Sequence, residues 1–296
     1  MKMMTLPRGV LARLGMASAI LAFAGSARAA DPQLVEARKL YNSTDFERSL
    51  KVLQAILPKD GPVYQLMGRD YYMQADYKRA TEVLEKAFAM EPANAEYALW
   101  LGRAWGRRAE TSSPFTAPVY ASRARQYFEK SVQLNPTNLE AQSDLFEYYL
   151  EAPGFLGGGL DRAEATAARM TRISPVEGQW AEAKLAEKRK ESRSAEAHLR
   201  MAVELAPQQV GKIIELARFL TKQGRYQEAD QNFERAEKVA PDNPRVVFAR
   251  ALIYIEAHHN LDIARQLLKR YMSMDLHPDD PPKSEAAKLL RQAQGG

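Results

Sequence analysis

The sequence contains no cysteine, and this absence removes several classes of protein from consideration. Disulfides, thiolate metal sites, a cysteine nucleophile and lipoprotein processing are all excluded. Histidine is also scarce, with residues only at His198, His258, His259 and His277. The adjacent pair at 258 and 259 would point to different faces of a helix, which makes it a poor metal site. We therefore predict no metal site and no cofactor.

Catalytic motifs and long apolar segments are missing as well. The sequence has no HExxH, GxSxG or comparable motif, so we predict that the chain is not an enzyme. The N-terminal apolar stretch "LGMASAILAFAG" has about 12 residues, fewer than the ~20 that a transmembrane helix needs. We therefore expect no transmembrane segment in the mature chain.

The first 29 residues have the pattern of a secretory signal peptide. Lys2, Arg8 and Arg13 precede the apolar stretch, and small residues stand at Ala27 and Ala29, where a signal peptidase reads them. We expect cleavage before Ala30 and a location in the bacterial periplasm. The alternative is that this segment is retained as an anchor.

Loss of the signal peptide changes the interpretation of the charge. The precursor has a net charge of +5, and residues 1–29 contain four basic residues and no acidic one, so the mature chain carries +1. A nearly neutral chain gives no electrostatic reason to expect binding to nucleic acid or to a membrane surface. We therefore predict no nucleic-acid partner.

Prolines recur behind apolar helix-like segments along the mature chain. They stand at positions 92, 136, 175, 207 and 241, with gaps of 44, 39, 32 and 34 residues. The gaps correspond to a 34-residue period that carries two insertions and one deletion. Such a period is typical of stacked helical hairpins, because a single hairpin cannot bury its apolar face alone.

The residues at fixed offsets within this period resemble the tetratricopeptide repeat. The best-matching positions are Tyr64, Met67, Gly68, Tyr71, Ala80, Leu84, Ala87 and Pro92 in one repeat, and Ile213, Leu216, Ala217, Leu220, Ala229, Phe233, Ala236 and Pro241 in another. The resemblance implies an all-α fold, a right-handed α-solenoid of about seven helical hairpins. We assign the repeat domain to residues 30–276, and a capping helix and tail to residues 277–296.

The two insertions should enlarge two turns in adjacent repeats. One falls within "GRRAETSSPFTAPVYAS" and the other within "EAPGFLGGG". Corresponding turns of a solenoid emerge on the same edge, so we expect these two rim loops to be neighbours. The candidate partner-binding residues of the rim loops are Phe115, Tyr120, Phe155, Leu156, Gly157, Gly158 and Gly159.

The glycines of the second rim loop do not indicate nucleotide binding. A phosphate-binding loop follows a strand and ends in Gly-Lys-Ser/Thr, whereas Gly159 is followed by Leu160 and Asp161. We expect the three glycines to supply positive φ angles and close backbone approach. Phe155 and Leu156 then either pack back on the hairpin or project to contact a partner.

In this family the first helix of each hairpin lines the concave surface, where peptide ligands often bind. The ninth position of that helix is arginine in four repeats, and tyrosine follows three residues later in two of them. Guanidinium and phenol groups suit carboxylates and extended peptides. The candidate groove residues are Arg38, Tyr41, Arg69, Tyr72, Arg103, Arg107 and Arg218.

A simpler interpretation is that these arginines are solvated and pair with neighbouring carboxylates. The groove also departs from family members that clamp a terminal carboxylate with Lys and Asn, since Leu34, Gln65 and Leu99 stand at the matching positions. We therefore predict a protein or peptide partner, acidic in one version of the hypothesis, but not a chaperone tail.

The sequence as a whole predicts an exported protein-binding scaffold that holds a partner segment in the concave groove, aided by the rim loops. One alternative is a structural subunit of an envelope or secretion assembly. Another is a module that binds a glycan or small ligand through the rim loops. The identity of the partner and the oligomeric state remain open.

Overall fold

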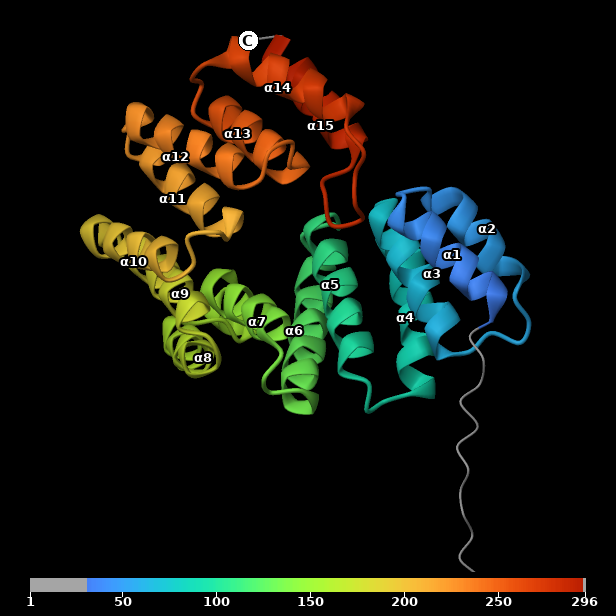
Figure 1. Ribbon diagram of the computed structural model, residues 1–296. Coiled ribbons are helices and arrows are strands. Elements are labelled where there is room, and N and C mark those ends of the chain that lie inside the picture. Colours follow the sequence, from blue (N-terminus) through green and yellow to red (C-terminus); the bar gives the residue numbers. More distant parts are fainter. Residues whose placement is uncertain (1–30, 295–296) are drawn as a thin grey trace, which may run out of the picture. The chain divides into compact units, whose positions relative to one another are not determined.

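A computed structural model describes residues 31–294 of the protein (Figure 1). The expected signal peptide lies outside these residues. The described part contains fifteen α-helices, one short 3₁₀ turn and no strand. The helices are α1 (Pro32–Asn42), α2 (Phe46–Ala55), α3 (Gly61–Met73), α4 (Tyr77–Met90), α5 (Ala95–Glu110), α6 (Ala117–Leu134), α7 (Leu139–Glu151), α8 (Leu160–Ile173), α9 (Pro175–Lys188), α10 (Ser192–Leu205), α11 (Val210–Lys222), α12 (Tyr226–Val239), α13 (Pro244–Glu256), α14 (Leu261–Ser273) and α15 (Lys283–Gln294).

The predicted all-α repeat architecture is confirmed. Helices α1 to α14 form seven consecutive hairpins, and neighbouring hairpins pack against one another in chain order (Figure 1). Helix α15 packs on α14 and α13, with Ala286 and Ala293 buried against them. It covers the end of the stack, as the sequence predicts for a capping helix.

Local sequence signals explain where several helices begin. The side chains of Asn94 and Asn138 accept hydrogen bonds from the first backbone N–H groups of α5 and α7. Asn243 does the same for α13, and Pro244 follows it in the first turn, where a missing N–H costs nothing. These caps fix the starting points of helices that line the concave side.

The two helices of a hairpin approach so closely that glycine is required at the crossing. A Cβ atom on Gly68 would lie 2.3 Å from Cγ of Leu84, and one on Gly102 would lie 2.6 Å from Cδ1 of Phe128. No side chain could be added at either place without pushing the helices apart. Gly68 and Gly102 therefore permit the close packing of their hairpins.

One sequence prediction about the turns is wrong. The insertion between Trp105 and Ala124 does not form a long loop, because α5 continues to Glu110 and α6 begins at Ala117. The inserted residues therefore mostly lengthen the two helices, since arginine, alanine and glutamate at the end of α5 are good helix formers. Tyr120, predicted to lie in the rim loop, is part of α6.

The apolar core runs along the stack in two clusters that meet on α9. The first extends from Ala37 to Leu185 and the second from Ala183 to Ala286. Aromatic residues between the helices are buried in these clusters, with Trp105 at 3% and Phe233 at 0% exposure. Each cluster therefore spans several consecutive hairpins, as stacked repeats require.

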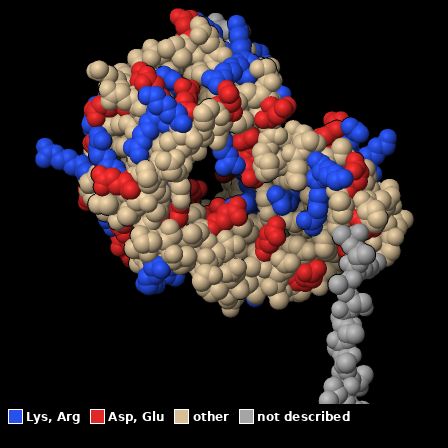
Figure 2. Space-filling model, viewed as in Figure 1, with Lys and Arg blue, Asp and Glu red and all other residues tan. Residues whose placement is uncertain are grey.

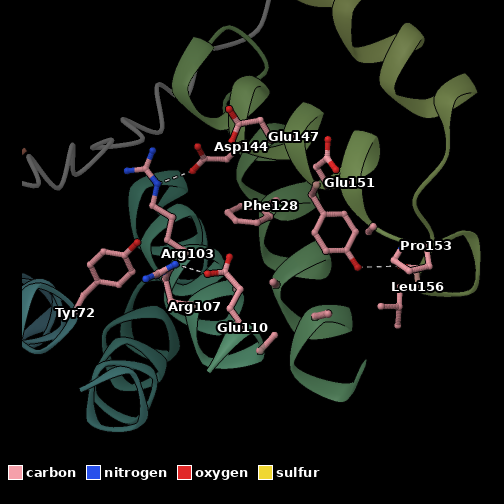
Figure 3. A pocket seen from close by; sticks show the side chains of 16 residues that line it. Tyr72, Arg103, Arg107, Glu110, Phe128, Asp144, Glu147, Glu151, Pro153 and Leu156 are labelled. Carbon is pink, nitrogen blue, oxygen red and sulfur yellow. Dashed lines mark hydrogen bonds and ion pairs between the residues drawn. The ribbon is translucent and has the colours of Figure 1, made fainter. Parts of the chain in front are cut away.

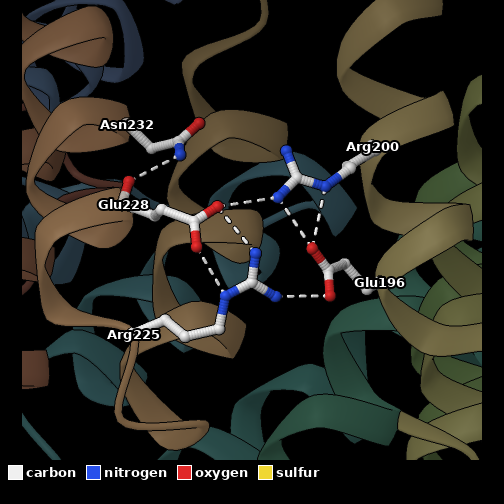
Figure 4. A network of polar contacts seen from close by, with 5 residues as sticks. All are labelled: Glu196, Arg200, Arg225, Glu228 and Asn232. Carbon is white, nitrogen blue, oxygen red and sulfur yellow. Dashed lines mark hydrogen bonds and ion pairs between the residues drawn. The ribbon is translucent and has the colours of Figure 1, made fainter. Parts of the chain in front are cut away.

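A charged network also joins neighbouring hairpins (Figure 4). Arg225, in the turn before α12, binds Glu196 of α10 and Glu228 of α12, each at 2.6 Å. Arg200 of α10 bridges to Glu228 at 3.1 Å. These groups are largely solvated, so their attraction is weakened by salt and adds little to the apolar packing.

A buried carboxyl group lies between the first two hairpins. Asp70 of α3 is fully buried, and the hydroxyl of Ser49 donates a hydrogen bond of 2.7 Å to its Oδ2. Its Oδ1 has no hydrogen-bond partner. Burial raises the pKa of Asp70 from 3.8 to about 8, despite the hydrogen bond from Ser49 and the nearby Arg69.

This pKa predicts that folding stability falls with rising pH. Because the folded-state pKa is raised, the contribution is fully present below about pH 4 and is lost as the pH rises through about 8. We expect Asp70→Asn to flatten the dependence of the denaturant midpoint on pH between about 5 and 8. The same change at exposed Asp275 should leave that slope unaltered. An equal slope in the Asp70 variant and the wild type would contradict the assignment.

Candidate partner-binding groove

The first helices of the hairpins line a concave surface, which we call the groove. It contains a cavity of about 800 Å³ lined by α3, α5, α7, α11 and α13. The segment Pro278–Pro282 and Glu285 of α15 complete the lining. Figure 2 shows a central hollow with acidic and basic side chains around it. The groove therefore has the form expected of a solenoid binding surface.

An alternating column of aromatic and guanidinium groups crosses the N-terminal half of the groove. The guanidinium of Arg69 lies between the rings of Tyr41 and Trp100, 4.7 and 4.5 Å from their centroids. Arg103 lies on Trp100 at 5.1 Å. Tyr41 is only 3% exposed, so its ring supports Arg69 and offers little surface to a partner.

Arg103 is held by two carboxylates of the next hairpin. Its Nε donates to Asp144 at 2.5 Å (Figure 3), and its Nη2 donates to Glu140 at 2.8 Å. The hydrogen bonds and charges of these carboxylates raise the pKa of Arg103, although burial opposes them. The guanidinium predicted to bind an acidic ligand is thus already paired within the chain.

The other predicted groove residues differ in whether they form ion pairs within the chain. Arg107 is exposed and pairs with Glu110, a residue of the same helix. Arg38 and Arg218 form no hydrogen bond or ion pair within the described residues, and Arg218 lines the 800 Å³ cavity. Burial raises the pKa of Tyr72 to about 12, so its phenol is neutral at physiological pH.

The turn Ala152–Gly159 is built as the glycines predict. Gly157 and Gly159 have φ angles of 84° and 148°, which favour glycine. A Cβ atom on Gly158 would lie 1.8 Å from the carbonyl oxygen of Ala152. The hydroxyl of Tyr148 donates to the carbonyl oxygen of Leu156 at 3.0 Å and fixes the turn against α7.

The apolar residues of the rim have different surroundings. Phe115 and Phe155 are 91% and 80% exposed. Leu156 turns inward and lines a cavity with Ala109 and Glu110 at the end of α5. Tyr120 packs on Trp105 with ring centroids 5.2 Å apart. The two phenylalanines therefore remain the exposed candidates for partner contact.

The cavity beneath this turn has a volume of about 500 Å³ and opens into the groove (Figure 3). It shares Tyr72 and Arg103 with the larger cavity. Its apolar lining includes Phe128, Leu156 and Pro153. Its charged lining includes Arg107, Glu110, Asp144, Glu147 and Glu151. The arrangement can hold an apolar group that carries a charge at one end.

Two features of the groove were missed by the sequence reasoning. Trp100 is the ring on which both Arg69 and Arg103 lie. The second feature is an acidic stripe on α7, and its members are Glu140, Asp144, Glu147 and Glu151. Their spacing of four, three and four residues places them on one helix face. That spacing was a signal from which the stripe could have been found.

These repeats and their concave surface define an α-solenoid protein. Comparison with known families and solved structures shows which repeat it contains. Residues 214–243 match the family model described as tetratricopeptide repeat. A tetratricopeptide repeat protein from Parabacteroides merdae is similar over 88% of this chain and 97% of its own, with 14% identity and a TM-score of 0.58. A thermophilic tetratricopeptide-repeat protein of Thermus thermophilus is similar over 67% of this chain and 97% of its own, with 19% identity and a TM-score of 0.50.

Residues 214–243 therefore form a tetratricopeptide repeat, and the described chain shares the fold of these solved tetratricopeptide-repeat proteins. No curated protein sequence matches the chain significantly. Proteins of this family are generally interaction scaffolds whose concave surfaces bind other proteins. The matched repeat and the shared fold confirm the resemblance seen in the sequence, and they leave the candidate residues of the groove and rim as predictions.

The geometry of the rim turn gives a testable consequence. We expect Gly158→Ala to lower the free energy of unfolding by about 2–3 kcal/mol, because the new methyl group collides with a backbone carbonyl. Gly154→Ala is the matched control, since nothing lies within 4 Å of a Cβ placed there. Urea denaturation of both variants measures the difference. Equal stability of the two would show that the turn is not built as described.

Proposed function

We propose that this protein is a protein-binding scaffold that holds an extended or helical segment of a partner in the groove. The observation that carries the proposal is the cavity of about 800 Å³, lined by the first helices of several hairpins and by the segment Pro278–Pro282 with Glu285. Its walls combine Trp100 and Phe248 with charged groups, which is the mixture that peptide recognition uses.

An acidic partner is supported by only part of the predicted arginine set. Neither Arg38 nor Arg218 forms a salt bridge among the described residues, although the charge of Arg218 helps to lower the pKa of Glu215. Both can therefore bind a carboxylate from outside. Arg69, Arg103 and Arg107 already contact Glu96, Asp144 and Glu110 respectively. Acidic residues of the partner would therefore bind at the two ends of this arginine set.

A second candidate function uses the rim. A shallow cavity of about 510 Å³ lies between the α3–α4 and α5–α6 turns, and its polar lining includes Tyr77, Tyr120, Arg108 and Asp76. Aromatic and polar groups together are suited to a glycan or another small polar ligand. A rise in melting temperature on addition of such a ligand, lost when Tyr77 is substituted, would favour this function over the scaffold.

A structural subunit of an envelope or secretion assembly would instead depend on α15, through Leu289 and Leu290.

We also propose that the protein is exported to the bacterial periplasm through the segment 1–29. The arrangement of basic residues, a short apolar stretch and small residues before Ala30 supports this location. Among the described helices, none is both long enough and apolar enough to cross a membrane.

The groove can be tested by site-specific photo-crosslinking in the bacterial envelope. We expect a probe at Tyr72 to crosslink one defined partner, and a probe at Phe155 to report on contact with the rim. A probe at Glu234, exposed on α12, is the control and should give no specific product. Crosslinks confined to Phe155 would contradict binding in the groove.

Charge reversal tests whether the partner is acidic. Arg38→Glu and Arg218→Glu should each reduce the Tyr72 crosslink several-fold, because each replaces an unpaired cation by an anion. Arg235→Glu, at an exposed position on α12, should not. An undiminished crosslink in both groove variants would rule out recognition of acidic residues at these positions.

Export makes a separate prediction about the N-terminus. We expect the protein isolated from the periplasm to begin Ala30-Asp31-Pro32, as measured by intact mass and N-terminal sequencing. Replacing Ala27 and Ala29 by bulky residues should block cleavage, because the peptidase accepts only small side chains there. Recovery of uncleaved protein in the cytoplasm would contradict export.

A further inference from the structure

The cavity beneath the Ala152–Gly159 turn exists because its floor is made of small residues. Gly106, Ala109, Ala121 and Ala124 face it from α5 and α6. Unlike Gly102, Gly106 is not required by helix packing, because a Cβ atom there would meet only Cβ of Ala124 at 3.9 Å. The space at this position is therefore open volume that a larger residue could occupy.

The walls of this cavity are apolar on the rim side. Phe128 and Leu156 line it, together with Pro153 and Ala152 of the turn. Tyr148 donates a hydrogen bond to the carbonyl oxygen of Leu156 and so holds this wall in place (Figure 3). An aliphatic chain inserted between these side chains would leave water for an apolar surface.

The charged mouth of the cavity has more carboxylates than cations. Arg103 is bound to Asp144 and Arg107 to Glu110 (Figure 3). Across the groove, Glu151 is bound to Lys188 of α9 at 2.8 Å. These pairs neutralise every charged side chain of the lining except one.

The exception is Glu147 of α7. It forms no hydrogen bond or ion pair within the described residues. Lys184 of the next hairpin acts on Glu147 through its charge, but it is bound to Glu215 at 2.6 Å. Glu147 is exposed to the groove, and partial desolvation together with the charge of Asp144 raises its pKa, while the charge of Lys184 opposes this shift.

We propose that this cavity is a subsite for a lysine or arginine side chain of the partner segment, with the aliphatic stem against Leu156 and Phe128 and the cation at Glu147. The inference rests on the proposed scaffold function and specifies one element of its partner. A peptide in the groove reaches this subsite directly, because Tyr72 and Arg103 border both cavities. A long basic side chain fits since its stem is apolar and its end is charged.

The subsite can be tested without knowledge of the partner. The probes are n-hexylamine as a mimic of the lysine side chain, hexan-1-ol as its neutral analogue and hexanoate as its anionic analogue. Ligand-observed NMR titrations of the purified protein measure their affinities. We expect the amine to bind several-fold more tightly than the alcohol, and hexanoate to bind most weakly, because a carboxylate would meet Glu147.

Three variants locate the site. Glu147→Gln should weaken amine binding roughly tenfold and leave the alcohol unchanged, because only the charge is removed. Ala121→Phe should abolish binding of both by filling the cavity. Glu234→Gln, at an exposed position on α12, is the matched control and should bind like the wild type. Circular dichroism spectra confirm that each variant is folded.

Several outcomes would overturn the inference. They are absence of amine binding, equal affinity for the amine and the alcohol, preference for hexanoate, and unchanged amine affinity in Glu147→Gln. None of these results affects the Tyr72 crosslink, which tests the groove itself. Failure of the subsite and failure of the scaffold function are therefore distinguishable.

Discussion

The close approach of paired helices is the constraint on which the rest of the structure depends. At Gly68 and Gly102 the partner helix lies so near that a single added carbon would overlap Leu84 or Phe128. Such contact gives each hairpin a thin, rigid form but leaves its outer apolar faces uncovered. Those faces are covered only by the next hairpin, so the chain forms a stack and needs α15 at its end.

The same stacking determines the chemistry of the groove. The first helices of successive hairpins present their polar faces side by side, so unlike charges on neighbouring helices can pair. Arg103 of α5 pairs with Asp144 of α7, and Lys188 of α9 pairs with Glu151 of α7. The Arg103 pair is partly buried and the Lys188 pair is exposed, and both leave fewer charges free for a ligand. Most charged side chains of the groove therefore join neighbouring hairpins. Recognition of a partner depends on the charged side chains that remain unpaired after the hairpins have stacked.

The fold was largely predictable from the sequence, because the 34-residue period and the small residues at helix crossings are local signals. The helix caps at Asn94 and Asn138 and the glycine turn at 157–159 were predictable for the same reason. The ion pairs of the arginines were not predictable from the sequence. Arg103 and Asp144, for example, lie 41 residues apart and meet only after two hairpins have packed. The length of the α5–α6 turn was also misjudged, because an insertion of good helix formers extends helices as readily as it enlarges a loop.

The charged side chains without a salt bridge in the groove restrict the charge pattern of the partner segment, which the fold alone does not. Arg38 is exposed on α1 and Arg218 lines the larger cavity from α11, while Glu147 on α7 lies between these helices in the order of the stack. A uniformly acidic segment would satisfy the two arginines but would place a like charge beside Glu147, which repels it. A segment with a basic residue between acidic ones satisfies all three. The charges without a salt bridge thus favour a partner segment of mixed charge over a uniformly acidic one.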